Sequence, residues 1–269
     1  MKIFIDTADL AEIKDAFSWG IVEGITTNPS LMKKAQDKQG GTNLEEYVKK
    51  ILVASRGTPV SLEVLGGTAE EMYAQGKKLY SKFKNYGAVV IKIPVNPSVD
   101  DNSKVHYEGL KATKMLSEEN IPVNVTLVMT PEQALLAAIA GATYVSPFAG
   151  RIDDHLRKQR GKEFGKLDYF NKHGIKDSKG NLITDTGLVS GVHLINSIAS
   201  IFRNYNFKTQ ILAASTRNAR QVREIAEAGA HIATIPFPVL KEMIHHHKTL
   251  EGMKAFTDDI VPEYRKLFE

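Results

Sequence analysis

The sequence predicts an α/β protein built as a single-domain (β/α)8 barrel. Short apolar runs rich in β-branched residues recur along the 269 residues, and longer stretches of helical period lie between them. There are eight such runs, and eight strands that alternate with helices over this length are typical of a (β/α)8 barrel. A doubly wound open sheet is the alternative, but no G-x-G-x-x-G sequence follows the first run. No change of composition divides the chain, so we expect one domain over residues 1–269.

Eight segments are predicted as strands from their apolar, β-branched composition. They are KIFID (2–6), VEGITT (22–27), PVSLEV (59–64), AVVIKIP (88–94), PVNVTLV (122–128), ATYVSPF (142–148), QILAAS (210–215) and HIATIP (231–236). Their recurrence between helical segments predicts that they pair in parallel.

The helices between these runs are recognised by their first and last residues. Thr68 and Thr130 are each followed by acidic residues, as expected of N-caps that precede acidic first turns. Gly57, Gly141 and Gly229 stand where helices should end. The helical segments include DLAEIKDAFSWG (9–20), NLEEYVKKILVAS (43–55), TAEEMYAQGKKLYSKF (68–83) and TPEQALLAAIAGA (130–142).

Two later segments depart from this alternation. Residues 153–186 are polar and rich in Lys and Gly, and we interpret them as an insertion after the sixth strand that carries one short helix at 162–173. A C-terminal helix is predicted over 249–268, and its apolar stripe should pack on its own barrel or on a neighbouring subunit of a homo-oligomer. The stripe consists of Met253, Phe256, Ile260, Val261, Tyr264 and Leu267.

The composition argues against several classes of protein. The chain is 42% hydrophobic and 25% charged, which is ordinary for a soluble globular protein. Its 35 basic and 31 acidic residues leave a net charge of +4, without the basic stripe of a nucleic-acid-binding protein. There is no cysteine, which excludes disulfides and thiolate metal sites. No segment resembles a signal peptide or a membrane span. We therefore expect a cytoplasmic protein with no nucleic-acid or membrane partner.

Lys92 is a single ammonium group inside the apolar run AVVIKIPV. Burial in a parallel strand favours the neutral amine, which can attack a carbonyl carbon and form a Schiff base. The alternative is a structural lysine that extends its head group to water or pairs with a carboxylate. Asp6 and Glu63 are the candidate partners, and either would also be placed for acid–base chemistry.

Polar residues gather at the ends of the predicted strands, where barrel enzymes carry their catalytic groups. Each alone has an ordinary explanation, such as helix capping by Asp6 or Asn28. A Schiff base on Lys92 would turn a ketone carbon into an electron sink, so that aldol cleavage needs no metal or other cofactor. Asp6 suits the base of that reaction. Asn28, Asn124 and Ser146 suit sugar hydroxyls, and Arg151, Ser215 and Arg217 suit a phosphate, which a guanidinium binds bidentately.

Five motifs resemble the transaldolase family. GITTNPSLM (24–32) looks like its first signature, VIKIP (90–94) is similar to the strand of its Schiff-base lysine, and NVTLV, VSPFAGRID and LAASTRN resemble its later strand ends. The resemblance extends from residue 1 to about 245. It implies a barrel that transfers a dihydroxyacetone unit from a ketose phosphate to an aldose phosphate. The implied substrates are sedoheptulose 7-phosphate with glyceraldehyde 3-phosphate, and the products are erythrose 4-phosphate and fructose 6-phosphate.

The resemblance also implies a role for each residue that matches. Lys92 matches the Schiff-base lysine, and Asp6 matches the acid/base that transfers the proton. Glu63 and Thr126 match a pair that positions a catalytic water. Asn28, Asn124 and Ser146 match the donor-binding groups, and Arg151, Ser215 and Arg217 match the phosphate site.

Two positions bear on the choice within the family. The related fructose-6-phosphate aldolases carry tyrosine at the position of Phe148 and glutamine at that of Glu63, so this sequence favours transfer. The alternatives are a sugar-phosphate aldolase that cleaves without an acceptor, and a non-catalytic phosphate-binding barrel, which would not explain Lys92. Two segments, 95–108 and 153–186, are longer than in the shortest family members and bear on the acceptor preference.

Overall fold

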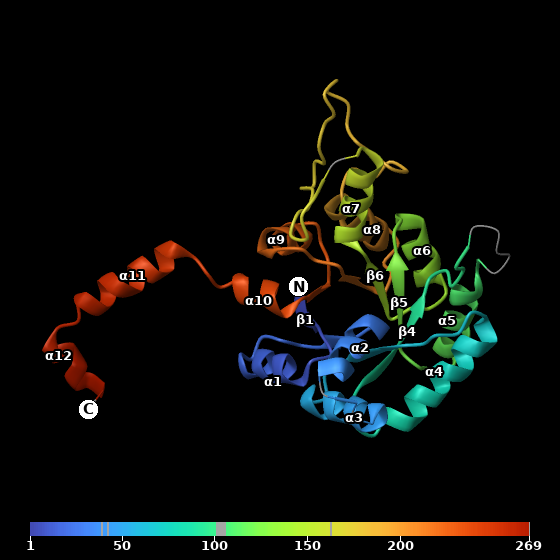
Figure 1. Ribbon diagram of the computed structural model, residues 1–269, viewed down its shortest axis with the longest axis horizontal. Coiled ribbons are helices and arrows are strands. Elements are labelled where there is room, and N and C mark those ends of the chain that lie inside the picture. Colours follow the sequence, from blue (N-terminus) through green and yellow to red (C-terminus); the bar gives the residue numbers. More distant parts are fainter. Residues whose placement is uncertain (39, 42, 101–105, 162, 269) are drawn as a thin grey trace.

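The computed structural model describes residues 1–38, 40–41, 43–100, 106–161 and 163–268. Its centre is a closed barrel of parallel strands in the order β1 to β8, in which β8 pairs with β1 (Figure 1). The strands are β1 (Lys2–Asp6), β2 (Ile25–Thr26), β3 (Val60–Glu63), β4 (Val89–Pro94), β5 (Val123–Val128), β6 (Tyr144–Pro147), β7 (Gln210–Ala213) and β8 (Ile232–Ile235). The predicted (β/α)8 barrel is confirmed, with each strand inside the run expected for it.

Helices surround the barrel (Figure 1). The predicted caps are present, because Thr68 and Thr130 each form a capping box with the residue three positions later. Gly141 and Gly229 follow helices at φ of +95°, where glycine is favoured. The helices are α1 (Leu10–Ser18), α2 (Pro29–Lys38), α3 (Leu44–Ala54), α4 (Ala69–Phe83), α5 (Glu108–Glu118), α6 (Pro131–Ile139), α7 (Ala149–Gln159), α8 (Gly191–Asn204), α9 (Ala219–Glu227) and α10 (Phe237–Glu242).

Strand register aligns the polar residues at the carboxyl ends. Asp6 on β1 pairs with Thr26 on β2. Glu63, Lys92 and Asn124 pair in a row across β3, β4 and β5. Because side chains of register partners point to the same face of a sheet, each of these rows faces one side of the barrel wall. The closed barrel therefore brings residues that are far apart in the sequence to one end of its interior.

The segment after β6 differs from its prediction. Helix α7 continues to Gln159, so the irregular connection covers the described residues 160–161 and 163–190 instead of beginning at 153. The prediction of a helix at 162–173 is wrong for the described part, since residues 163–173 form turns and irregular structure. Two short antiparallel bridges, Lys176–Leu182 and Asp185–Leu188, order the second half of this connection. Residues 163–173 lack a regular apolar stripe that could pack a helix against the barrel, which is why this segment is irregular.

The C-terminal segment also differs from its prediction. The continuous helix expected over 249–268 is instead α11 (His247–Asp258), α12 (Pro262–Arg265) and a 3-10 turn (Lys266–Phe268). Pro262 has no backbone N–H, so it begins a new helix rather than continuing α11. The segment projects away from the barrel (Figure 1), and Leu250 and Phe256 are 69% and 72% exposed. The expected packing on its own barrel is therefore not observed.

None of the described helices is both long enough and apolar enough to cross a membrane.

Candidate active site

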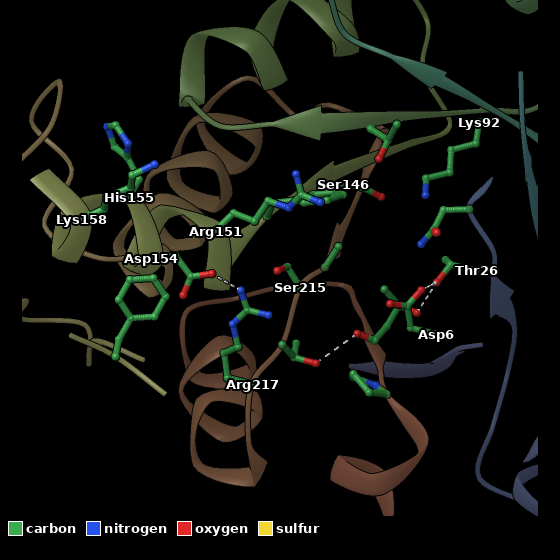
Figure 2. A pocket seen from close by; sticks show the side chains of 18 residues that line it. Asp6, Thr26, Lys92, Ser146, Arg151, Asp154, His155, Lys158, Ser215 and Arg217 are labelled. Atoms are coloured by element: carbon green, nitrogen blue, oxygen red, sulfur yellow. Dashed lines mark hydrogen bonds and ion pairs between the residues drawn. The ribbon is translucent and has the colours of Figure 1, made fainter. Parts of the chain in front are cut away.

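A cavity of about 720 Å³ opens at the carboxyl ends of the strands. Nine of the eleven predicted site residues line it, and each lies in the carboxyl-terminal half of a strand or in the residues that follow a strand, as in barrel enzymes. Figure 2 shows Lys92, Thr26 and Asp6 on one side of the cavity and Arg217, Asp154, His155 and Lys158 toward the other. The nine are Asp6, Asn28, Lys92, Thr126, Ser146, Phe148, Arg151, Ser215 and Arg217.

Lys92 is held by two oxygen atoms at the inner side of the cavity. Its Nζ lies 3.1 Å from Glu63 Oε2 and donates a hydrogen bond of 3.1 Å to the carbonyl oxygen of Thr27. Lys92 is only 5% exposed, which means that the ammonium group has exchanged water for these partners. Of the two carboxylates that were candidate partners, Glu63 makes the ion pair. Glu63 itself does not line the cavity, and its contact with the cavity is the ion pair with Lys92.

Asp6 faces the same cavity from the end of β1. Its carboxylate accepts a hydrogen bond of 2.7 Å from Thr26 Oγ1. Burial raises the pKa of Asp6 above the ordinary value of 3.8, and this effect is opposed by the Thr26 hydrogen bond and by the charge of Lys92. A carboxyl group with a raised pKa is suited to accept a proton and to return it.

Asn124 is the second predicted residue that does not line the cavity, because it is fully buried behind Ser146. Ser146 Oγ donates to Asn124 Oδ1 at 2.7 Å, and Asn124 Nδ2 donates to Ser61 Oγ at 3.1 Å. These bonds fix the orientation of the Ser146 hydroxyl. Thr126 Oγ1 is buried and has no hydrogen-bond partner within the described part of the chain, so it is available to a ligand.

The outer side of the cavity is cationic. Arg151 and Arg217 line it, and the Arg151 guanidinium lies over the Phe148 ring at 5.4 Å. Ser215 is in the left-handed region at φ +61°, which is strained for a residue other than glycine and is found most often at functional sites. Arg217 forms an ion pair with Asp154, which the sequence did not predict.

Several lining residues were missed by the sequence analysis. Asp154, His155 and Lys158 come from α7, one to two turns after Arg151, and Phe164 comes from the connection that follows. Their spacing from Arg151 in RIDDHLRK could have identified them. Asp154 and His155 follow Arg151 by three and four residues, and Lys158 by seven, so a helix places all three on the face that carries Arg151. Phe164 could not be found this way, because its position depends on the path of an irregular segment.

Side-chain contacts with α7 and α9 hold the connection after α7 near the cavity. The Arg157 guanidinium lies 4.3 Å from the Phe170 ring and 5.8 Å from the Phe164 ring. Tyr169 donates a hydrogen bond of 3.0 Å to Glu224 Oε1 on α9. These contacts hold Phe164 at the cavity rim. Among the described residues, no group of three or more His, Asp or Glu side chains is placed to hold a metal ion.

A closed parallel barrel with a polar cavity at the carboxyl ends of its strands is the arrangement of a barrel enzyme. The family model described as Transaldolase/Fructose-6-phosphate aldolase matches residues 3–269. The chain belongs to this family, and it is an enzyme of the transaldolase type.

Curated relatives cover nearly the whole chain. A protein named "Probable transaldolase" from Desulfatibacillum aliphaticivorans is 42% identical over 96% of this chain and 97% of its own length. One of the same name from Caldicellulosiruptor saccharolyticus is 43% identical over 96% of each chain. A third, from Thermoplasma volcanium, is 41% identical over 96% of this chain and 95% of its own length.

Proposed function

We propose that this enzyme transfers a dihydroxyacetone unit between sugar phosphates through a Schiff base on Lys92. One observation carries the proposal: a buried lysine faces a cavity that also holds a carboxyl group of raised pKa and, on the other side, two arginines. The donor is sedoheptulose 7-phosphate and the acceptor glyceraldehyde 3-phosphate, which gives erythrose 4-phosphate and fructose 6-phosphate. This is a step of the pentose phosphate pathway.

In the proposed reaction, the Lys92 amine attacks the C2 carbonyl of the ketose phosphate after passing a proton to Glu63, 3.1 Å away. Loss of water gives an iminium ion. Asp6 takes the proton of the C4 hydroxyl, the C3–C4 bond breaks, and its electron pair forms an enamine while the aldose phosphate leaves. The acceptor aldehyde is attacked by the enamine and receives the proton back from Asp6. Water, positioned by Glu63 and Thr126, then hydrolyses the new iminium ion.

The remaining predicted residues hold the substrate in this proposal. Asn28 and Ser146 bind hydroxyls of the dihydroxyacetone unit, and Asn124 contributes by fixing the orientation of the Ser146 hydroxyl. Arg151, Ser215 and Arg217 bind the phosphate. The volume of the cavity, about 720 Å³, lies within the range of small-molecule sites and accommodates a sugar phosphate.

Borohydride reduction tests the Schiff base directly. The protein is incubated with fructose 6-phosphate, reduced, digested and analysed by mass spectrometry, and we expect a dihydroxyacetone adduct on Lys92. Lys92→Met should give no adduct and no turnover. Lys158→Met is the matched control, because Lys158 also lines the cavity and its removal should leave the adduct in place. An unmodified wild-type chain would contradict the proposal and favour a non-catalytic phosphate-binding barrel.

Cleavage of a sugar phosphate without an acceptor is the second candidate function. Transfer is favoured because Phe148 lines the cavity without a hydroxyl that could protonate the enamine carbon. We expect transfer to erythrose 4-phosphate to exceed acceptor-free cleavage by about a hundredfold, equivalent to roughly 2.7 kcal/mol in barrier. The assay follows glyceraldehyde 3-phosphate release from fructose 6-phosphate with and without acceptor. Equal rates would establish cleavage as the reaction.

We also propose a cytoplasmic homo-oligomer. The projecting segment 247–268 exposes Leu250, Met253 and Phe256, and burying such apolar side chains against another subunit would stabilise an assembly. Sedimentation velocity should give a mass above 29.8 kDa for the full chain and a smaller assembly when the chain ends at 246. A full chain that sediments as a monomer would contradict this.

A further inference from the structure

The Arg217 side chain is held in place by the protein itself. Its guanidinium forms an ion pair with Asp154 of α7 at the edge of the cavity, as Figure 2 shows. The side chain is mostly buried, and its Nε has no hydrogen-bond partner within the described part of the chain. Arg217 is therefore oriented by its contact with Asp154, while the residue lines the cavity and its guanidinium keeps N–H donors that Asp154 does not use.

The Arg217 backbone is held by a second contact that also leads to α7. Its N–H donates to Gln221 Oε1 at 2.8 Å, and Gln221 Nε2 donates to Asp153 Oδ2 at 3.1 Å. Asp153 Oδ1 accepts from the N–H of Gly191 at 2.7 Å. Gln221 and Asp153 are fully buried, so water does not compete for these hydrogen bonds.

Two consecutive residues of one helix thus reach Arg217 by different routes. Neighbouring positions on an α-helix point about 100° apart. Asp153 accordingly points into the protein toward Gln221, while Asp154 points to the cavity edge. Both routes end at Arg217, one at its backbone and one at its guanidinium.

We propose that Asp154 and the Asp153–Gln221 pair are positioning residues, which orient Arg217 before the substrate arrives and so set the preference for phosphorylated sugars. The proposal rests on the proposed phosphate site and goes beyond it, because it assigns a role to α7 residues outside that site. An arginine that is already ordered loses less conformational entropy when a phosphate binds. The opposite possibility is that Asp154 competes with the phosphate and weakens binding.

A double-mutant cycle separates these two possibilities. The proteins are wild type, Arg217→Ala, Asp154→Asn and the double variant, and each is titrated with inorganic phosphate by calorimetry. The cycle isolates the contribution of Arg217 from the direct repulsion between Asp154 and phosphate. We expect Arg217→Ala to raise Kd about tenfold in the wild-type background and less than about threefold in the Asp154→Asn background.

Asp185→Asn is the matched control for charge. Asp185 lies after α7 and pairs at 3.4 Å with His155, which is on α7 as Asp154 is. Asp185→Asn changes the net charge by the same amount as Asp154→Asn without removing a contact of Arg217. In that background the effect of Arg217→Ala should stay about tenfold. Asp154→Asn should also raise KM for fructose 6-phosphate more than KM for fructose, with kcat nearly unchanged, which a purely structural role would not do.

The outcomes are distinct. An equal or larger effect of Arg217→Ala in the Asp154→Asn background overturns the positioning role. If Arg217→Ala does not weaken phosphate binding even in the wild type, both the phosphate site and the positioning role are refuted. If the cycle gives the expected coupling but borohydride traps no adduct on Lys92, the positioning role stands and the proposed reaction fails. Thermal unfolding of each variant shows whether the fold is retained.

Discussion

Gly150 is the point at which α7 touches the loop that carries Ser215 and Arg217. Its N–H donates a hydrogen bond of 3.0 Å to the Ser215 carbonyl oxygen. In Gly150→Ala, the new Cβ would lie 2.3 Å from that oxygen and 2.5 Å from Arg217 Nε. Ordinary contacts to carbon are near 3.5 Å, so helix and loop must separate by about 1 Å. We predict that this single methyl group weakens both phosphate binding and stability.

The magnitude follows from the contacts that are lost. The separation breaks the Gly150 hydrogen bond and the adjacent one from Ala149 N to Ala214 O, also 3.0 Å. Two such bonds contribute about 1–3 kcal/mol, and the helix propensity of alanine offsets up to about 1 kcal/mol. We expect the free energy of unfolding to fall by roughly 1–2 kcal/mol. Displacing Arg217 removes a charge-assisted contact, so Kd for phosphate should rise by about tenfold or more.

Urea unfolding and calorimetric titration with inorganic phosphate measure the two effects. Gly252→Ala on α11 is the control, because a Cβ there meets no atom within 4 Å. That variant should bind phosphate normally and should be equally or slightly more stable, since alanine is the better helix former. If Gly150→Ala keeps wild-type stability and phosphate affinity, the close approach of α7 to this loop does not organise the site.

Three further predictions concern single side chains. Lys92→Arg should release as little glyceraldehyde 3-phosphate from fructose 6-phosphate and acceptor as Lys92→Met does, because arginine stays protonated. Turnover at a few per cent of the wild-type rate would exclude the Schiff-base role. Phe148→Tyr should raise acceptor-free cleavage and shrink the ratio of transfer to cleavage, and an unchanged ratio would show that enamine protonation is controlled elsewhere. Burial raises the pKa of Asp153 from 3.8 to about 7, so the folded state binds more protons than the unfolded state between these values. The free energy of unfolding should therefore fall as pH rises from about 4 to 7, by up to roughly 4 kcal/mol, and Asp153→Asn should flatten that slope in urea titrations at several pH values.

The barrel could be predicted because strand composition is a local property. Each run of apolar residues predicts a buried strand without reference to its neighbours, and eight runs between helices leave few topologies. The same logic placed most of the site, since the carboxyl ends of all strands in such a barrel meet at one end. The sequence left Asp6 and Glu63 as alternative partners of Lys92, and the register of β3 with β4 places Glu63 beside it.

The contacts of α7 and of the connection after it could not be predicted. The pairing of Arg217 with Asp154 joins residues 63 positions apart, and it depends on how closely α7 approaches the loop after β7. The packing of Arg157 on Phe170 depends on the path of an irregular segment. For the C-terminal segment, the apolar stripe correctly indicated helix, but periodicity says nothing about what a helix packs against.

The two sides of the cavity differ in charge, and in the proposed reaction one side carries the reacting groups while the other binds the phosphate. On the inner side, the ammonium of Lys92 is balanced by Glu63, so the pair adds little net charge where the carbonyl of the sugar would lie. On the outer side, the described lining residues include three cationic side chains, those of Arg151, Arg217 and Lys158, and one carboxylate, that of Asp154. This side of the cavity therefore keeps a net positive charge. In the proposed reaction, a sugar phosphate would therefore be oriented with its phosphate outward and its carbonyl toward Lys92. Changes on α7 should alter which substrates bind, whereas changes at Lys92, Glu63 or Asp6 should alter whether bound substrate reacts.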